Sequence, residues 1–153
     1  MARQGFWAVS SGRISFRRDG RWYSDDEPIN NPRIARLFSQ CLRQTGDGRW
    51  EITMAEERAL VQVEDTPWVI TGVERDEGGS FTLRLNDGTE ERLDPTTLAV
   101  GAQNVLYARV KGGSHRARFL RPAYYQLAPA IEEGDGRFVL TSGGQRFEIP
   151  PAA

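Results

Sequence analysis

The sequence predicts an α+β protein built from two related β-β-α-β-β units of mostly antiparallel strands, each with one helix, packed together. Three observations lead to this class. Glycine turns recur between short strand-like runs, and two segments carry helical patterns that begin at a proline. Each helical pattern is followed by a near-copy of one segment, "GDGRWEIT" at 46–53 and "GDGRFVLT" at 134–141. At 153 residues, the chain can bury a core without disulfide or metal staples.

Five glycine turns predict five antiparallel hairpins, because glycine adopts the positive φ angles of tight hairpin turns without strain. These turns contain Gly20, Gly78-Gly79, Gly88, Gly112-Gly113 and Gly143-Gly144. The expected strands are 13–16, 21–23, 49–53, 58–64, 68–75, 81–85, 90–93, 105–110, 116–120, 137–141 and 146–149.

The first helix is expected to begin at Pro32, with Asn31 as its N-cap and Gly46 as a left-handed residue at its end. Its apolar residues follow helical spacing and form one stripe: Ile34, Leu37, Phe38, Cys41 and Leu42. A second, shorter helix is expected to start at Pro122 and to be limited by Pro129.

The near-repeat sets the expected domain organisation. Each copy is preceded by two strands joined by a glycine turn and then by a helix, and each is followed by a closing strand. We therefore expect a first unit over 1–101 and a second unit over 102–153, with the strands between 67 and 101 extending the first sheet. Two coincidental junctions between a helix and a hairpin are the alternative.

Composition excludes several classes of function. The net charge of −1 disfavours a nucleic-acid partner, which a strongly basic chain would attract. Cys41 is the single cysteine and His115 the single histidine, so neither an internal disulfide nor a zinc site based on cysteines can form, and we expect no metal and no cofactor. The segment "MARQGFWAVSSG" lacks the apolar run of a signal peptide, and no stretch could span a membrane. We expect a cytoplasmic protein.

Four segments, in this order, resemble one bacterial family: "DGRWY", "ARLFSQCLR", "LVQVEDTPWVI" at 60–70 and "SGGQRFEI" at 142–149. The family is catalogued as domain of unknown function 1285, and the resemblance runs over about 12–149. The resemblance implies a two-part α+β architecture built from repeated motifs. It implies no established activity, and it suggests a part in signal transduction.

Catalytic constellations are scarce in this sequence. His115 follows a Gly-Gly turn, a poor place to assemble a nucleophile and its base, and Cys41 falls on the apolar face of the first helix. Glu64 and Asp65 end one strand together, but adjacent strand residues point to opposite faces. We expect them to anchor the turn, with contact to a ligand as the alternative.

Arginines concentrate in two of the predicted hairpins. The hairpin in the second unit carries five basic residues and no acid: Arg109, Lys111, Arg116, Arg118 and Arg121. The first hairpin carries Arg13, Arg17, Arg18 and Arg21 against Asp19 alone. Side by side, these hairpins would form a basic strip flanked by Trp22, Tyr23 and Tyr107.

The leading hypothesis is therefore a binding or adaptor module, and not an enzyme. It would recognise a small anionic ligand or a protein partner at the junction between the units, through Trp22, Tyr23, Glu64, Asp65, Arg109 and Arg118. One alternative is a hydrolase or isomerase that uses the carboxylates of Glu64 or Asp65 without a histidine or cysteine. Another is a structural subunit whose exposed sheet edge pairs with a second copy to give a homodimer.

Overall fold

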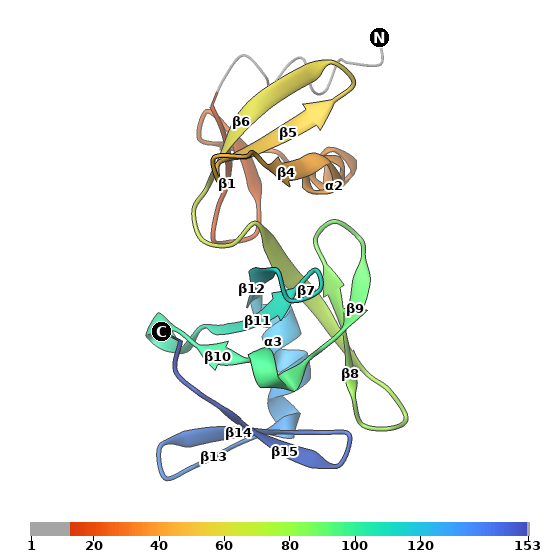
Figure 1. Cartoon of the computed structure of the whole chain (residues 1–153), viewed down its shortest axis with the longest axis vertical. Helices are drawn as coiled ribbons and strands as arrows, with labels where there is room; N and C mark the ends of the chain where they lie inside the picture. The colour runs from red at the N-terminus through yellow and green to blue at the C-terminus, as the bar shows by residue number, and fades with distance from the viewer. Residues whose placement is uncertain (1–12, 153) are drawn as a thin grey trace. The chain divides into compact units, whose positions relative to one another are not determined.

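The computed structural model describes residues 13–152 and shows a strand-rich α+β protein (Figure 1). The chain divides into two compact units, Met1–Pro67 and Trp68–Ala153, whereas the sequence placed the boundary between residues 101 and 102. Each unit contains one six-stranded sheet, and the two sheets have similar topology. Within the described residues, no helix combines the length and the apolar character that crossing a membrane requires.

Sheet A belongs to the first unit and has the strand order β3-β2-β1-β6-β5-β4. Its strands are β1 (Ile14–Phe16), β2 (Trp22–Ser24), β3 (Glu27–Pro28), β4 (Leu42–Gln44), β5 (Trp50–Met54) and β6 (Glu57–Val63). Every neighbouring pair is antiparallel except β1 and β6, which pair in parallel with Phe16 opposite Val63. The first strand of the unit thus lies beside its last strand.

Helix α2 (Pro32–Cys41) begins as the sequence predicts and ends earlier. The side chain of Asn31 accepts hydrogen bonds from the backbone N–H groups of Arg33 at 2.9 Å and Ile34 at 3.4 Å, which satisfies two donors of the first turn. The expected role of Gly46 as the helix end is wrong. Strand β4 follows α2 directly, so Gly46 lies in the turn between β4 and β5.

Three aromatic rings form the core of the first unit. The ring of Trp22 lies 4.9 Å from that of Phe16 and 5.5 Å, edge to face, from that of Phe38, measured between centroids. Because the indole is only 1% exposed, its N–H needs a partner, and it donates to Ser39 Oγ at 2.9 Å. Helix α2 is therefore held to the sheet by Phe38 and Ser39 on one face.

Sheet B belongs to the second unit and has the order β10-β11-β12-β7-β8-β9. Its strands are β7 (Trp68–Arg75), β8 (Phe81–Leu85), β9 (Glu90–Arg92), β10 (Ala99–Val100), β11 (Leu106–Val110) and β12 (His115–Phe119). We expected the strands between 67 and 101 to extend the first sheet. That expectation is wrong, because β7 pairs in parallel with β12, with Ile70 opposite Phe119.

The two six-stranded sheets share one plan. Each consists of two antiparallel meanders of three strands, and in each the first strand of the first meander pairs in parallel with the last strand of the second. In sheet A the two meanders are separated along the chain by α2, and in sheet B by the short 3-10 helix Pro95–Thr97. The α+β class with two related units is therefore confirmed. The strands β1–β6 of sheet A correspond in order to β7–β12 of sheet B.

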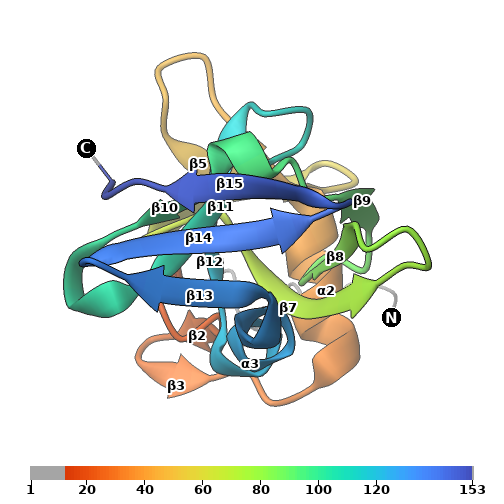
Figure 2. The same ribbon diagram turned by 90° about the horizontal axis from the view of Figure 1, so that it is seen from below.

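Sheet C is a three-stranded antiparallel meander in the second unit: β13 (Ile131–Gly134), β14 (Arg137–Ser142) and β15 (Gln145–Ile149). It follows helix α3 (Arg121–Leu127) and lies across sheet B (Figures 1 and 2). Leu140 and Ile149 of sheet C join the core that sheet B and α3 form. The chain after β15 hydrogen-bonds along the edge of β10, through Val100 N to Pro150 O at 2.9 Å.

All five predicted hairpins are present, and each predicted turn contains a glycine with positive φ. The two copies of the near-repeat lie in different kinds of sheet. Gly46–Gly48 form the turn before β5 in sheet A, whereas Gly134 ends β13 and Asp135-Gly136 form the turn before β14 in sheet C. A strand, and not a helix, precedes each copy.

Truncating Phe38 tests the core of the first unit. We expect Phe38→Ala to lower the free energy of unfolding by about 3–5 kcal/mol, because the buried ring leaves a cavity against Trp22. Leu37→Ala is the matched control, since Leu37 is adjacent on the helix but exposed, and it should cost about 1 kcal/mol or less. Urea unfolding followed by tryptophan fluorescence measures both, and equal losses would contradict this core.

Candidate functional site

The hairpin of β11 and β12 carries an arginine face on the side of sheet B away from the core. Strand alternation sends Leu106, Ala108 and Val110 into the core, together with Ala117 and Phe119 from β12. The intervening residues point outward: Tyr107 and Arg109 on β11, and Arg116 and Arg118 on β12. Tyr107 lies opposite Arg118, and Arg109 opposite Arg116. We call these four residues the arginine face.

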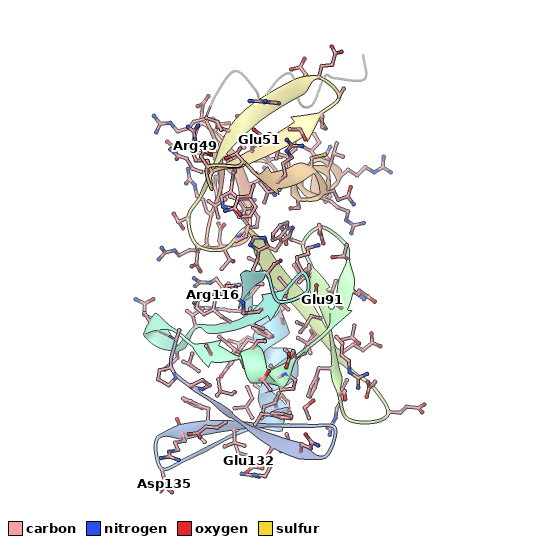
Figure 3. All side chains as sticks on the ribbon, viewed as in Figure 1. Arg49, Glu51, Glu91, Arg116, Glu132 and Asp135 are labelled. Carbon is pink, nitrogen blue, oxygen red and sulfur yellow. The ribbon has the colours of Figure 1, made fainter. Side chains whose placement is uncertain are left out.

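Arg116 and Arg109 are held in place by uncharged groups, so their positive charges are not neutralised. The guanidinium of Arg116 lies 4.1 Å from the centroid of the Tyr107 ring (Figure 3 labels Arg116). Arg109 Nε donates to the carbonyl of Gly113 at 2.8 Å, closing the hairpin turn. Within residues 13–152, neither Arg109 nor Arg116 has a carboxylate within ion-pair distance. Like charges placed directly opposite each other on neighbouring strands are destabilising.

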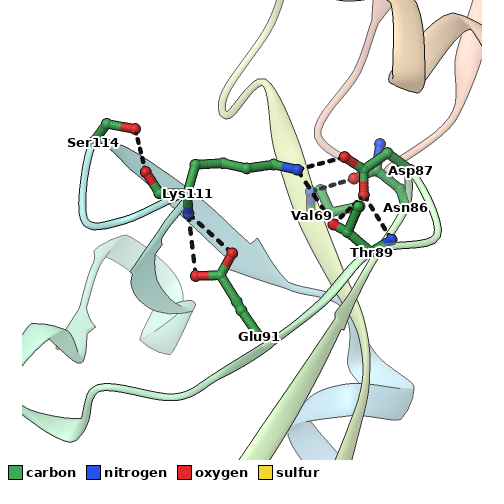
Figure 4. Close-up of polar contacts among 7 residues, drawn as sticks. All are labelled: Val69, Asn86, Asp87, Thr89, Glu91, Lys111 and Ser114. Atoms are coloured by element: carbon green, nitrogen blue, oxygen red, sulfur yellow. Dashed lines mark hydrogen bonds and ion pairs between the residues drawn. The ribbon is translucent and has the colours of Figure 1, made fainter.

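A partly buried ion pair fixes the turn of this hairpin to the neighbouring turn between β8 and β9 (Figure 4). Lys111 Nζ lies 2.5 Å from Asp87 Oδ2 and donates to Thr89 Oγ1 at 3.2 Å. The backbone N–H of Lys111 points to both carboxylate oxygens of Glu91, at 3.0 and 3.1 Å. These contacts hold Lys111 at φ 57°, a left-handed conformation that non-glycine residues seldom adopt.

The electrostatics of Asp87 follow from these contacts. Burial by itself would raise the pKa of the carboxyl, but the hydrogen bonds from Lys111 and Thr89 and the charge of Lys111 outweigh it, so the pKa of Asp87 is lowered. Asp87 therefore stays ionised at neutral pH. We call the contacts of Lys111 with Asp87 and Glu91 the Lys111 clamp. Because Asp87 neutralises the lysine charge, the clamp positions the arginine face and does not add to its charge.

Neither His115 nor Cys41 has the character of a nucleophile system. Burial, and then the nearby charge of Arg109, lower the pKa of His115, and its ring packs 5.2 Å from that of Trp68. Burial raises the pKa of the Cys41 thiol, which is the opposite of the shift that activates a cysteine. No group of three or more His, Cys, Asp or Glu residues able to hold a metal occurs in the described part of the chain.

The predicted site residues of the first unit fall in different environments. Trp22 is in the core, so its expected place beside a ligand is wrong; its ring completes the cluster with Phe16 and Phe38. Tyr23 is half-buried, and its hydroxyl donates to Asp19 at 2.5 Å, a hydrogen bond that is the main reason its pKa is raised. The guanidinium of Arg17 lies 4.0 Å from the Tyr23 ring and is paired with Asp26.

The carboxylate of Glu64 anchors the first hairpin. Its Oε1 accepts from the backbone N–H of Arg18 at 3.0 Å and lies 3.1 Å from the Nε of the same residue. Asp65 is half-buried in the segment that follows β6. Glu64 thus contacts the turn of the first hairpin, whereas the sequence predicted that it anchors the turn at Pro67. The structure places Arg109 and Arg118 together on one face.

Sequence reasoning did not assign the clamp of Lys111, Asp87 and Glu91. Lys111 lies 20 residues after Glu91 and 24 residues after Asp87 in the chain, and no spacing in the sequence marks them as neighbours. Strand alternation could have placed Arg116 and Tyr107 on the arginine face, since they alternate with core residues on the two strands that carry Arg109 and Arg118.

Comparisons show which proteins this two-unit α+β chain resembles. Residues 7–66 match the N-terminal domain of the domain of unknown function DUF1285. A DUF1285 family protein from Silicibacter pomeroyi DSS-3 has a similar structure, with a TM-score of 0.66 and 26% identity over 89% of this chain and 78% of that one. A second, from Shewanella baltica OS155, has a TM-score of 0.59 and 21% identity over 78% of this chain and 93% of that one.

The resemblance seen in the sequence is therefore confirmed: the first unit matches the DUF1285 N-terminal domain, and two structures of DUF1285 family proteins are similar to this chain. No curated protein matches it. The description of this family names no activity. A function can therefore be inferred only from the residues of this chain.

Substituting Gly101 tests the support beneath the arginine face. A Cβ at Gly101 would lie 2.8 Å from Cε2 of Tyr107, so Gly101→Ala should displace the ring and cost about 1–3 kcal/mol. Gly46→Ala is the control, because nothing lies within 4 Å of its Cβ position, and it should be neutral or stabilising by up to about 1 kcal/mol. Urea unfolding followed by circular dichroism compares the two; equal effects would contradict the packing of Tyr107.

The ion pair of Asp87 predicts a pH dependence of stability. Because the pKa of Asp87 is lower in the folded chain, its contribution is present above about pH 4 and is lost as pH falls through the folded pKa. Asp87→Asn should cost about 2–3 kcal/mol at pH 7 and flatten the acid limb of the profile.

Asp135→Asn is the control for this prediction, since Asp135 is an exposed turn residue with φ 55° that asparagine also tolerates. Urea unfolding between pH 7 and pH 3 gives both profiles. An acid limb that is unchanged in Asp87→Asn would show that another group causes it.

Proposed function

We propose that this chain is a binding module that recognises an anionic ligand or an acidic partner through the arginine face. The observation that carries the proposal is the cross-strand pair of Arg109 and Arg116, two cations placed opposite each other with no carboxylate partner in the described residues. An anion between them would relieve their repulsion and accept hydrogen bonds from both guanidinium groups.

Preorganisation supports the same reading. Tyr107 lies under the guanidinium of Arg116, the turn carbonyls hold Arg109, and the Lys111 clamp fixes the turn itself. Arginine side chains that are already ordered lose less conformational entropy when a ligand binds. A surface designed only for solubility would not need this support.

The sequence also predicts that recognition takes place at the junction between the units, in a cytoplasmic protein of bacterial signalling, with homodimer formation as an alternative use of the sheet edges. These finer points stay predictions. Catalysis by Glu64 or Asp65 stays the runner-up hypothesis, and no contact of these residues favours it.

The test is a thermal-shift screen with inorganic pyrophosphate, ATP and citrate as probes. A ligand present at about 100 times its Kd stabilises the folded chain by about 2.7 kcal/mol, which raises Tm measurably. We expect Arg116→Gln to weaken binding about tenfold, and added salt to weaken it further.

Arg137→Gln is the matched control, because Arg137 is an arginine on a strand of sheet C that is already paired with Glu148 at 3.5 Å. It should leave binding unchanged. Absence of a Tm shift with every probe, together with absence of an acidic partner in a pull-down, would overturn the proposal.

A further inference from the structure

A pocket lies within the second unit, between sheet C, α3 and the β10–β11 edge of sheet B. It has a volume of about 170 Å³, and it is separate from the arginine face. Its lining combines the largely apolar side chains of Val100, Leu106, Tyr124, Ile131, Phe138 and Ile149 with the polar side chains of Asn104 and Glu133. Leu106 and Ile149 are core residues, so the pocket opens on the edge of the core itself.

Strand register places a carboxylate on this apolar wall. Glu133 lies opposite Phe138, and Phe138 lies opposite Ile149, so these three residues form one row across the face of sheet C that packs on the core. Leu140, two residues after Phe138 on the same face, is completely buried. Glu133 is therefore an exposed acidic side chain in the same row as Phe138, which packs against the core, and the core residue Ile149.

Glu133 differs in its surroundings from the other glutamates of sheet C. Glu132 and Glu148 are on the opposite face, where they pair with Arg146 at 3.7 Å and Arg137 at 3.5 Å. Figure 3 shows Glu132 on the side of sheet C that points away from sheet B. Both arginines of the sheet serve that outer face, and within residues 13–152 Glu133 has no cation within ion-pair distance.

The other polar groups of the pocket are also available to a ligand. Neither the amide of Asn104 nor the hydroxyl of Tyr124 hydrogen-bonds to another side chain within residues 13–152. Gln103 and Asn104 have φ angles of 59° and 61°, two consecutive left-handed residues that present Asn104 at the pocket. Tyr124 is 37% exposed, unlike the buried Ala123 and Leu127 of the same helix.

We propose that this pocket binds a small organic cation, an ammonium group that carries methyl or other apolar substituents. The rings of Tyr124 and Phe138 supply faces that attract a cation, and Glu133 supplies the opposite charge. Val100, Leu106 and Ile131 supply apolar contact for the substituents. A bare metal ion would lack enough oxygen ligands here, and an anion would meet Glu133 without a compensating charge.

Choline and its uncharged carbon analogue, 3,3-dimethyl-1-butanol, test the proposal because they have nearly the same shape. We expect choline to cause saturable shifts in the ¹H–¹⁵N spectrum that map to the pocket, and the neutral analogue to bind at least about tenfold more weakly. Binding of the analogue with equal affinity, or no saturable shift with choline, would overturn the assignment.

Two variants at adjacent positions of β13 complete the experiment. Glu133→Gln should weaken choline binding about tenfold while the spectrum stays that of the folded chain. Glu132→Gln removes the same charge from the other face of the strand and should leave binding unchanged. Equal weakening by both variants would show a general effect of net charge and sink the proposal. The arginine face plays no part in this result, so the two proposals stand or fall separately.

Discussion

The parallel pairing of a first strand with a last strand is the constraint on which each unit depends. A meander of three strands is too small to bury a core, but β1 beside β6, and β7 beside β12, join two meanders into one six-stranded sheet. Residues of these central strands are among the most buried: Ile14 and Phe16 of β1 in sheet A, and Ile70 of β7 in sheet B. Without this pairing, the apolar faces of the meanders would stay exposed.

Charge is distributed according to the same plan. On sheet B the core side takes the small and branched residues of β11 and β12, and the outer side takes the arginines. The outer side of sheet C carries two arginine–glutamate pairs, whereas Glu133 is the one glutamate of the sheet on the core side. The second unit therefore has an arginine-rich face on sheet B and, separately, a pocket that combines apolar residues with the carboxylate of Glu133.

Local elements were predictable where a local signal defines them. Trp68–Arg75 and Phe81–Leu85 match the predicted strands residue for residue, because alternation and a glycine turn mark both ends. Asn31 capped the helix as its side chain predicts. The missed strands, Glu27–Pro28, Leu42–Gln44, Ala99–Val100 and Ile131–Gly134, have two to four residues each and no repeat of alternation to detect.

By itself, the sequence determined most of the longer strands, the five hairpin turns, the start of α2 and the resemblance to DUF1285 proteins, since each depends on residues that are close in the chain or on motifs. Only the tertiary structure decided which strands become neighbours, because the parallel pairing of β7 with β12 joins segments almost 50 residues apart and leaves no local pattern. The same holds for the clamp of Lys111 and Asp87 and for the pocket around Glu133, which exist only where separate hairpins meet.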